Sequence, residues 1–242
     1  MGILIWQHKR RVAWDDTLFH ITNNWEISDH SNYWHIMNWH WTEKYETLAN
    51  WRKVLDLDWT NYTFSNTFSE ANSATTFTAL VWAKFKSTPN FDYCLYWWAW
   101  RAKSSTDTTD RRWLRFQRVD SSVDCWILAW RSWTSWWVAS LSTYKIWIST
   151  SDFVLFGVTV NWWTYKLYKN WTLIWTMSSS TITWWTSTWP RLQTWAAVFS
   201  DWSEWVQWLP CYIWESILEK KVWTDDDFAE YFNSFKSLYW LS

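Results

Sequence analysis

The amino-acid sequence predicts an all-β protein, an antiparallel β-sandwich with one short C-terminal helix. From Val54 onward, short runs of alternating apolar and polar residues follow one another, with turn-forming residues between them. Many short strands at such spacing are typical of a sandwich. A helical pattern is clear in one place, close to the end of the chain. The 242 residues suffice for one large domain, and no stretch has the length of a linker between two.

The predicted strands are recognised by their alternation and by the turn residues that bound them. Residues 1–26 are predicted to form an N-terminal segment, and residues 27–242 the sandwich domain. The part before Val54 is polar and rich in turn formers, which indicates an ordered loop with short strands. The strands predicted after it are Val54–Phe64, Thr75–Phe85, Tyr93–Trp98, Arg112–Val119, Ser151–Val160, Thr164–Asn170, Thr172–Met177 and Cys211–Val222.

The predicted helix begins after Thr224, a suitable N-cap because its hydroxyl oxygen accepts a hydrogen bond from the first turn. Asp225–Asp227 place negative charge at the positive end of the helix dipole. We expect the apolar stripe of the helix to pack on the sandwich, with a partner-binding helix as the alternative. The stripe consists of four aromatic residues at helical spacing: Phe228, Tyr231, Phe232 and Phe235.

Tryptophan and glycine occur in unusual numbers. The chain contains 33 Trp and 2 Gly, whereas ordinary proteins contain about 7% Gly. Many Trp follow Asn or Asp in turn-like surroundings, as in Asn161-Trp162, Asn170-Trp171 and Asp58-Trp59. Asn-Gly and Asp-Gly are the usual signals of a type I′ turn, whose central residues need a positive φ. Gly adopts such a φ almost freely, whereas Trp meets the steric penalty of its Cβ.

This distribution leads to the hypothesis that most Trp stand where the natural protein has Gly. Some bacteria and their viruses read the codon UGA as Gly, and a translation that reads UGA as Trp would give this pattern. Gly2 and Gly157 would then come from ordinary Gly codons. The rival interpretation is a protein naturally rich in Trp. Three Trp fit their surroundings and are expected to be genuine: Trp14, Trp82 and Trp113.

The charge of the chain argues against several classes of partner. Its net charge is -1 at pH 7, so no overall field attracts nucleic acid or an anionic membrane. Arg111–Arg118 alternates basic and apolar residues as a half-exposed strand does, and we expect no nucleic-acid partner. No apolar stretch is long enough for a membrane span once the doubtful Trp are discounted.

The N-terminus and the cysteines predict synthesis in the cytoplasm. The first apolar run is too short for a signal peptide, and its basic residues follow it rather than precede it. Cys94, Cys125 and Cys211 are odd in number and lack C-x-x-C spacing, so we expect free or buried thiols. The expected location is a virion or the extracellular space after cytoplasmic synthesis.

With Gly in place of the doubtful Trp, five segments resemble one family in order and spacing. They are DHSNYWHIMNWHWT, RKVLDLDWTNYTF, TTFTALVWAKF, FVLFGVTVNWWTYKLYKNWTLIW and IWESILEKKVWTDDDFAEYF. Over residues 27–241 the chain resembles laminin G-like domains, pentraxin types included, of the concanavalin A-like lectin/glucanase superfamily. The fourth segment is the most specific. The resemblance implies a jelly-roll sandwich of two antiparallel sheets.

The resemblance also implies a binding role. Such domains mostly bind glycans, proteins or calcium, and they are common in phage tail and capsid-associated proteins and on cell surfaces; the fold alone does not fix the function. We expect a carbohydrate- or surface-binding domain of a phage virion or an adhesin, with a glycan or cell-surface ligand and other virion proteins as partners. A purely structural decoration protein of the virion is the alternative. The sugar-stacking candidates are Tyr33, Tyr62 and Tyr96.

Calcium is the cofactor that the resemblance suggests. Laminin G-like and pentraxin-like domains bind Ca²⁺ through carboxylate and amide oxygens on loops at the sandwich edge, which suit this hard cation. Solvated turn residues are the alternative explanation of the same loops. The residues in loops of similar position are Asn90, Asp92, Asp201, Glu204 and Gln207.

No catalytic motif stands out, and we expect no enzyme activity. Sandwich enzymes that cleave glycans use paired acids, often as E-x-D-x-x-E on one strand, and the chain lacks that motif. Asp56 and Asp58 alternate as residues of one strand face do, but Asp58 opens a predicted turn and is better explained as an Asx-turn residue. His30, His35 and His40 have a spacing that suits neither one helix face nor one strand face, so we expect no metal there. Glycoside hydrolysis is the third candidate function.

Overall fold

The computed structural model describes the strands, the helix and short adjoining segments, and the statements below concern these residues. They are residues 17–22, 28–29, 37–40, 42–48, 53–57, 62–65, 76–86, 94–101, 111–118, 124–131, 138–139, 146–147, 150–162, 164–178, 191–194 and 210–236.

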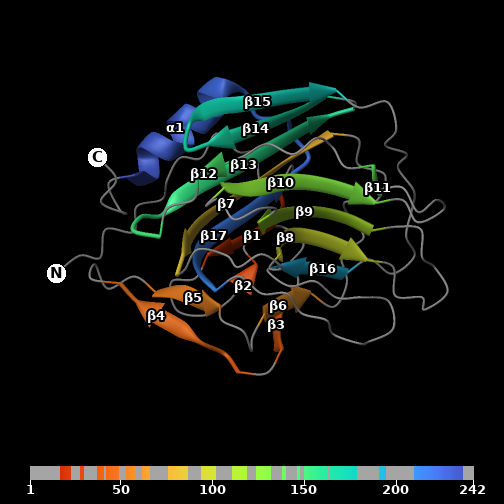
Figure 1. Ribbon diagram of the computed structural model, residues 1–242. Coiled ribbons are helices and arrows are strands. Elements are labelled where there is room, and N and C mark those ends of the chain that lie inside the picture. The colour runs from red at the N-terminus through yellow and green to blue at the C-terminus, as the bar shows by residue number, and fades with distance from the viewer. Residues whose placement is uncertain are drawn as a thin grey trace.

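The described chain forms two antiparallel β-sheets and one short C-terminal helix, α1 (Asp225–Phe235), as the sequence predicts (Figure 1). In spatial order, sheet A contains β15 (Thr172–Ser178), β14 (Thr164–Lys169), β13 (Val154–Asn161), β7 (Thr76–Phe85), β17 (Cys211–Glu219), β1 (Thr17–Thr22) and β2 (Ser28–Asp29), with β5 (Lys53–Leu57) beside β17 and β4 (Tyr45–Thr47) beside β5. Sheet B contains β11 (Val138–Ala139), β10 (Asp124–Arg131), β9 (Arg111–Arg118), β8 (Cys94–Arg101), β16 (Arg191–Thr194), β6 (Tyr62–Ser65) and β3 (Met37–His40), with β12 (Ile146–Trp147) beside β10.

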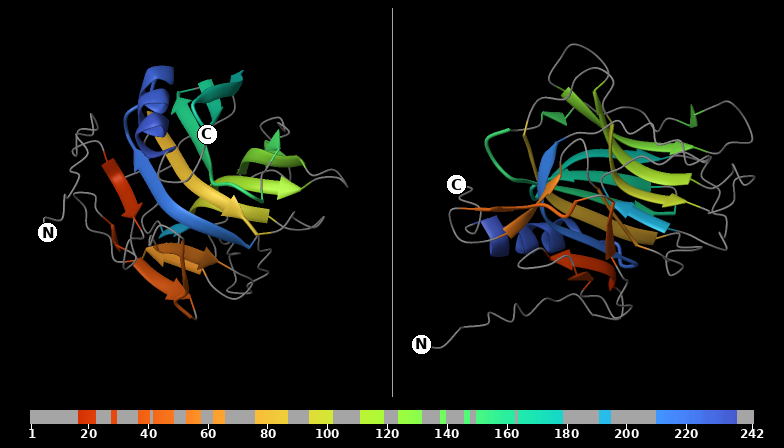
Figure 2. Two further views of the ribbon diagram at one scale, coloured as in Figure 1. Left: turned by 90° about the vertical axis from the view of Figure 1, so that its left-hand side faces the viewer. Right: turned by 90° about the horizontal axis from the view of Figure 1, so that it is seen from below.

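The sheets form two layers, and α1 lies on the side of sheet A that faces away from sheet B (Figure 2). The all-β sandwich with a short C-terminal helix is therefore confirmed. No helix among the described residues is long and apolar enough to cross a membrane.

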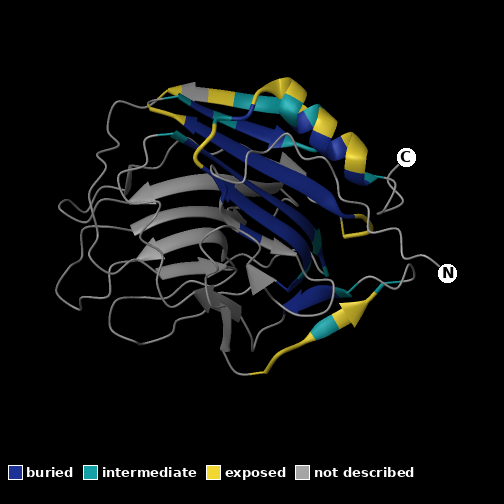
Figure 3. Cartoon of the chain, turned by 180° about the vertical axis from the view of Figure 1, so that it is seen from behind, coloured by how far each residue is buried: buried dark blue, intermediate teal, exposed yellow. Residues whose placement is uncertain are grey.

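Strand β7 is buried on both faces because sheet A has a covering layer on each side (Figure 3). Successive side chains of a strand point to opposite faces. Leu80 and Trp82 belong to the cluster that includes the aromatic residues of α1. Ala79 and Val81, which are fully buried as well, therefore point toward sheet B. This double burial explains why the strand has a continuous apolar run between Ala79 and Ala83.

Helix α1 has the start and the buried face that the sequence predicts. Thr224 caps it: the Thr224 hydroxyl accepts a hydrogen bond from Asp227 N at 3.2 Å, and Thr224 N donates to the Asp227 carboxylate at 2.8 Å. The predicted stripe is buried and stacks on rings of sheet A. Its pairs include Tyr168–Phe228 at 4.0 Å and Trp82–Phe232 at 5.5 Å between ring centroids. The capping box and the aromatic contacts fix where the helix begins and which face it buries.

Several strands match the predictions closely, and others do not. β7, β9, β13, β14, β15 and β17 lie within a few residues of the predicted runs. The predicted run Val54–Phe64 is wrong as a single strand, because it supplies β5 to sheet A and β6 to sheet B. The predicted Asp58-Trp59 turn falls between them, outside the described residues.

Strand β1 lies inside the predicted N-terminal segment 1–26, yet it pairs with β17 in sheet A. Residues 17–22 are thus part of the sandwich. The placement of a domain boundary between residues 26 and 27 stays a prediction. Strands β10 and β16 were not expected from the alternation of the sequence.

Candidate functional site

Two of the three tyrosines predicted to stack on sugars lie in sheet B. Tyr62 is the first residue of β6, and Tyr96 lies within β8. Only β16 runs between these two strands. Tyr33 lies outside the described residues. The sheet brings the strands of Tyr62 and Tyr96 near each other, and their role as a sugar platform stays a prediction.

The residues predicted to bind calcium lie outside the described part of the chain, so calcium binding stays a prediction. This holds for all five of them: Asn90, Asp92, Asp201, Glu204 and Gln207. Within the described ranges, no group of three or more His, Cys, Asp and Glu side chains could hold a metal ion. The histidines His30 and His35 are also outside these ranges, and His40 ends β3.

Strand β17 carries two glutamates, Glu215 and Glu219, the residue type with which many glycosidases act. Both are fully buried, at 0% exposure. A buried carboxylate needs polar partners, and Glu219 has them: Trp223 Nε1 donates to its Oε2 at 2.6 Å and the Thr17 hydroxyl donates to its Oε1 at 3.4 Å. A glycan has no access to these acids, so they stabilise the fold.

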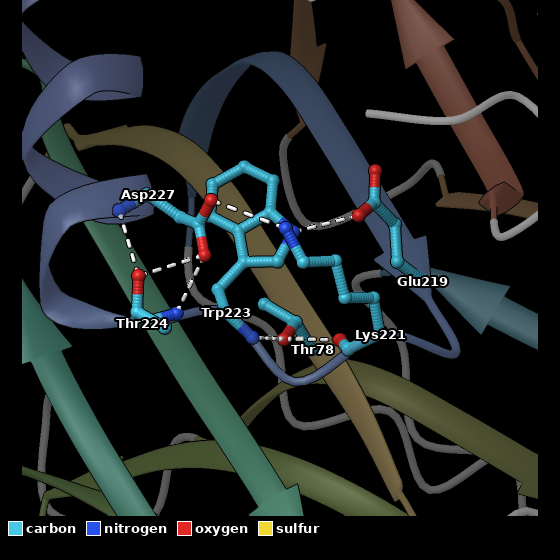
Figure 4. A network of polar contacts seen from close by, with 6 residues as sticks. All are labelled: Thr78, Glu219, Lys221, Trp223, Thr224 and Asp227. Atoms are coloured by element: carbon cyan, nitrogen blue, oxygen red, sulfur yellow. Dashed lines mark hydrogen bonds and ion pairs between the residues drawn. The ribbon is translucent and has the colours of Figure 1, made fainter. Parts of the chain in front are cut away.

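The bonds around Trp223 connect β7, β17 and the start of α1 (Figure 4). Trp223 N donates to the Thr78 hydroxyl at 2.8 Å, and that hydroxyl donates to the carbonyl of Lys221 at 2.7 Å. The ammonium of Lys221 contacts Asp227 Oδ1 at 3.1 Å. Because these groups satisfy one another, the connection between β17 and α1 is fixed.

Glu215 also connects three elements, β17, β1 and α1, through buried polar contacts. His20 Nε2 of β1 lies 2.6 Å from Glu215 Oε1, and the hydroxyl of Tyr231 on α1 donates to Glu215 Oε2. His20 and Tyr231 are themselves buried. The contact holds the N-terminal strand and the helix to the same strand of sheet A.

A second group of charges lies at the other end of β17, and we call it the lysine row: Lys84, Tyr212, Asp56 and Lys44, with Lys86 beside them. Lys84 pairs with Tyr212, Tyr212 pairs with Asp56, and Asp56 N donates to the carbonyl of Lys44 at 2.9 Å. Residues directly opposite in an antiparallel sheet share a face. Four neighbouring chain segments therefore place these side chains in one line.

Asp56 is the negative centre of the lysine row. Its side chain is 8% exposed, and it contacts the ammonium of Lys86 at Oδ1 and that of Lys44 at Oδ2, the second at 3.6 Å. The Lys86 ammonium also lies over the ring of Tyr212, 4.6 Å from its centroid. Asp56 thus has structural partners in these two lysines, and Asp58 lies outside the described residues.

Two lysines, Lys44 and Lys86, contact Asp56, and Glu46, which pairs with Val54, lies on the same face as Asp56. Burial, followed by repulsion from Lys44, lowers the pKa of Lys86. Burial and then the charge of Glu46 raise the pKa of Tyr212, so its phenol keeps its proton as a hydrogen-bond donor.

Two tryptophans lie exposed at hairpin turns. Trp162, at the β13–β14 turn, is 56% exposed and has a φ of 53°. Trp171, at the β14–β15 turn, is 47% exposed and follows Asn170, whose φ is 56°. Ring contact with Phe232 of α1 covers part of Trp171, at 4.6 Å between centroids. Both are among the Trp that the sequence marks as doubtful.

Sequence reasoning named Asp56 but missed the lysine row. Alternation placed Asp56 on a strand, and nothing in the local sequence showed that β17 and the end of β7 would lie beside it. The row depends on pairing between segments far apart in the chain. The lysines were visible in the sequence, but their positions relative to Asp56 could not be inferred without the strand register.

Comparisons with known proteins extend the description of the fold. No protein-family model matches the chain, and no curated protein matches it. Solved structures do match. The binding domain of Paraclostridial Mosquitocidal Protein 1 has a TM-score of 0.65 at 12% identity, and the match covers 92% of this chain and 53% of that one.

Botulinum neurotoxin binding domains are similar to a comparable degree. That of serotype C1 has a TM-score of 0.63 at 12% identity, over 91% of this chain and 52% of that one. That of neurotoxin DC has a TM-score of 0.65 at 12% identity, over 92% and 52%. The chain spans about half the length of each of these structures. At this identity the likeness establishes a shared fold, the all-β sandwich.

Proposed function

We propose that the chain is a non-catalytic domain that binds a carbohydrate or another cell-surface ligand. The observation that carries the proposal is the fold that it shares, over nearly its whole length, with binding domains of toxins. A neurotoxin DC binding domain was solved in complex with rat synaptotagmin II and with SialylT. Cell entry of botulinum neurotoxin type C depends upon interaction with two ganglioside molecules. Glycan and surface ligands are thus the chemistry to test first.

Three acids on the strands of sheet A support the non-catalytic part of the proposal. Glu215 and Glu219 are buried and bonded within the fold, and Asp56 is held by two lysines. A glycosidase needs two carboxyl groups that flank a sugar bond, and these three cannot do so in their positions. Glycoside hydrolysis is accordingly the less favoured function.

Within the sandwich class, we assign the chain to the laminin G-like jelly rolls of the concanavalin A-like superfamily. The motif order supports the assignment, because the segments that resemble the family form β7, the β13–β15 meander, and β17 followed by α1. On the same resemblance we place the protein in a phage virion or an adhesin, with calcium at the edge loops. A structural decoration protein of the virion is the competing role.

A glycan array, probed with and without calcium, tests the binding function. The proposed domain gives selective signals for a set of related glycans, and a calcium requirement shows as their loss in chelator. A decoration protein without a ligand gives no signal in either condition, and that outcome would overturn the proposal.

We also propose that Trp162 and Trp171 stand where the natural protein has Gly. Two features support this. Trp162 has a positive φ in a two-residue turn, where L-residues are strained and Gly is not. Both indoles are also largely exposed, in contrast to Trp82, which is fully buried, and to Trp223, whose Nε1 bonds to a buried carboxylate. Trp82 and Trp223 are accordingly genuine.

The intact mass of the protein from its natural source tests this proposal. If UGA encodes Gly, the natural protein is much lighter than the 29.9 kDa of the chain as written, and peptide sequencing finds Gly at 162 and 171 but Trp at 82. A mass of 29.9 kDa would contradict the proposal.

A further inference from the structure

We infer that Lys86 and Asp56 form an isopeptide bond once the chain has folded, an amide between the Lys86 amine and the Asp56 side-chain carboxyl group. The inference goes beyond the proposed binding function and does not depend on it. It follows from the strand pairing that brings the two side chains together, from their burial, and from a second ammonium group on the same carboxylate.

Strand β17 holds the two residues on either side of its start, where β5 and β7 are its neighbours. Asp56 of β5 pairs with Tyr212 of β17. The backbone N–H of Lys86, directly after β7, donates to the carbonyl of Pro210, directly before β17, at 3.0 Å. The main chain thus fixes both partners, and a reaction between groups held in contact avoids most of the entropy cost of bringing them together.

The two reacting groups touch in a poorly solvated place. The ammonium of Lys86 contacts Oδ1 of Asp56, and the side chains are 22% and 8% exposed. The ring of Tyr212 lies beside the amine, 4.6 Å from Nζ to the ring centroid. Because burial disfavours the charged forms of an amine and of a carboxyl group, it favours transfer of a proton from Lys86 to Asp56.

The environment of Lys86 also favours the neutral amine, which is the nucleophilic form. Burial, and then repulsion from Lys44, lowers the pKa of Lys86. The charge of Glu46 acts in the opposite direction and is outweighed. Lys86 therefore gives up its proton more readily than a solvated lysine does.

The reaction balances without an added reagent. Lys86 passes one proton to Asp56 Oδ1, and the lone pair of Nζ then adds to Cγ and forms the new C–N bond. The electrons of the carbonyl move to Oδ2, where the ammonium of Lys44, at 3.6 Å, stabilises the negative charge. When the carbonyl forms again, the Oδ1 hydroxyl leaves with a second proton from the nitrogen. One water molecule is released, and nothing is oxidised or reduced.

Lys86 is a better nucleophile for this reaction than Lys44. The side chain of Lys44 is 47% exposed and its ammonium is farther from the carboxylate, so it keeps more of its hydration. A bond from Lys86 joins β5 to β7 across β17 and closes a loop between residues 56 and 86. Such a covalent link restricts the unfolded chain and stabilises the fold.

The mass of the protein, measured under denaturing conditions, tests the inference. We expect the folded chain to be lighter, by one water molecule, than the mass calculated from its sequence. Chain that is isolated in urea and never allowed to fold keeps the full mass. After digestion with trypsin, the folded sample gives a branched peptide in which residues 54–84 are joined to residues 85–101, because trypsin does not cleave after an acylated lysine.

Two arginine variants separate the roles of the lysines. Lys86→Arg keeps a positive charge beside Asp56 but has no amine to acylate, so we expect the full mass. Lys44→Arg is the matched control, because it changes the other lysine on the same carboxylate and keeps a cation at Oδ2. We expect it to lose one water as the unmodified chain does.

Three results would overturn the inference. The first is a folded, unmodified chain with its full mass, folding being checked by circular dichroism. The second is a loss of water that persists in Lys86→Arg, since it would report dehydration at another position. The third is a branched peptide that contains Lys44 in place of Lys86. None of these results bears on glycan binding, so the proposed function would stand after any of them.

Discussion

Gly157 shows how a single residue limits the packing of α1 on sheet A. It lies in the middle of β13, and a Cβ at this position would overlap the ring of Phe228. Phe228 in turn stacks on Tyr168 and meets Trp223 edge-on at 5.2 Å. The ring has neighbours on more than one side, so it cannot move away freely.

The variant Gly157→Ala is expected to destabilise the protein by about 1–3 kcal/mol, because overpacking a filled core forces its neighbours to shift. Urea unfolding measures the effect, with Thr172→Ala as the control at an exposed position of sheet A. An unchanged midpoint for Gly157→Ala would mean that α1 packs less closely on β13 than described.

Trp162 and Trp82 are expected to respond in opposite ways to replacement by Gly. Trp162→Gly relieves the strain of a positive φ and stabilises the chain by about 1–2 kcal/mol, and it removes an exposed indole. Trp82→Gly empties a fully buried site and destabilises by about 3–5 kcal/mol or more. Denaturant titration measures the free energy of unfolding of both variants. Destabilisation by Trp162→Gly would count against a glycine at that turn.

At the scale of elements, α1 depends on its cap. Burial acts to raise the pKa of Asp227, but hydrogen bonds from Thr224 and the contact with Lys221 outweigh it, so the net pKa lies below 3.8. A folded-state pKa below the unfolded value gives stability that is present above about pH 4 and is lost as the pH falls through the folded value.

Asp227→Asn should therefore cost about 1 kcal/mol near neutral pH, in the range of a lost cap. The difference from the unmodified chain should shrink between pH 4 and pH 2, where Asp227 itself becomes protonated. Chemical unfolding followed by circular dichroism at several pH values measures it, and Asp226→Asn, an exposed neighbour, is the control. A difference that stays constant with pH would exclude the ionised carboxylate as the source.

The elements that the sequence predicted best are those whose signals are local. The meander β13–β14–β15 has its turns and alternation within one segment, and α1 has its cap and stripe within one segment. β1 escaped prediction because its partner β17 is nearly two hundred residues away. β5 and β6 were joined in error because alternation continues through a turn and does not say which sheet each half enters.

For the whole molecule, the candidate site also depends on long-range strand pairing, which local sequence signals do not predict. Asp56 was identifiable from its strand, but the lysine row exists only because β7, β17 and β5 lie side by side. Tyr62 and Tyr96 were named as separate residues, and the sheet order shows that their strands are near neighbours. Composition and motifs predicted the sandwich, whereas the long-range register that assembles a site had to come from the structure.

The central claim is that this sandwich binds a glycan without cleaving it, and one incubation tests both parts. The protein is mixed with the glycan that gives the strongest array signal, and bound ligand and new reducing ends are measured in the same sample over time. The account predicts saturable binding and a level of reducing ends equal to that of glycan alone. A rise in reducing ends that tracks protein concentration, or no binding to any glycan, would contradict it.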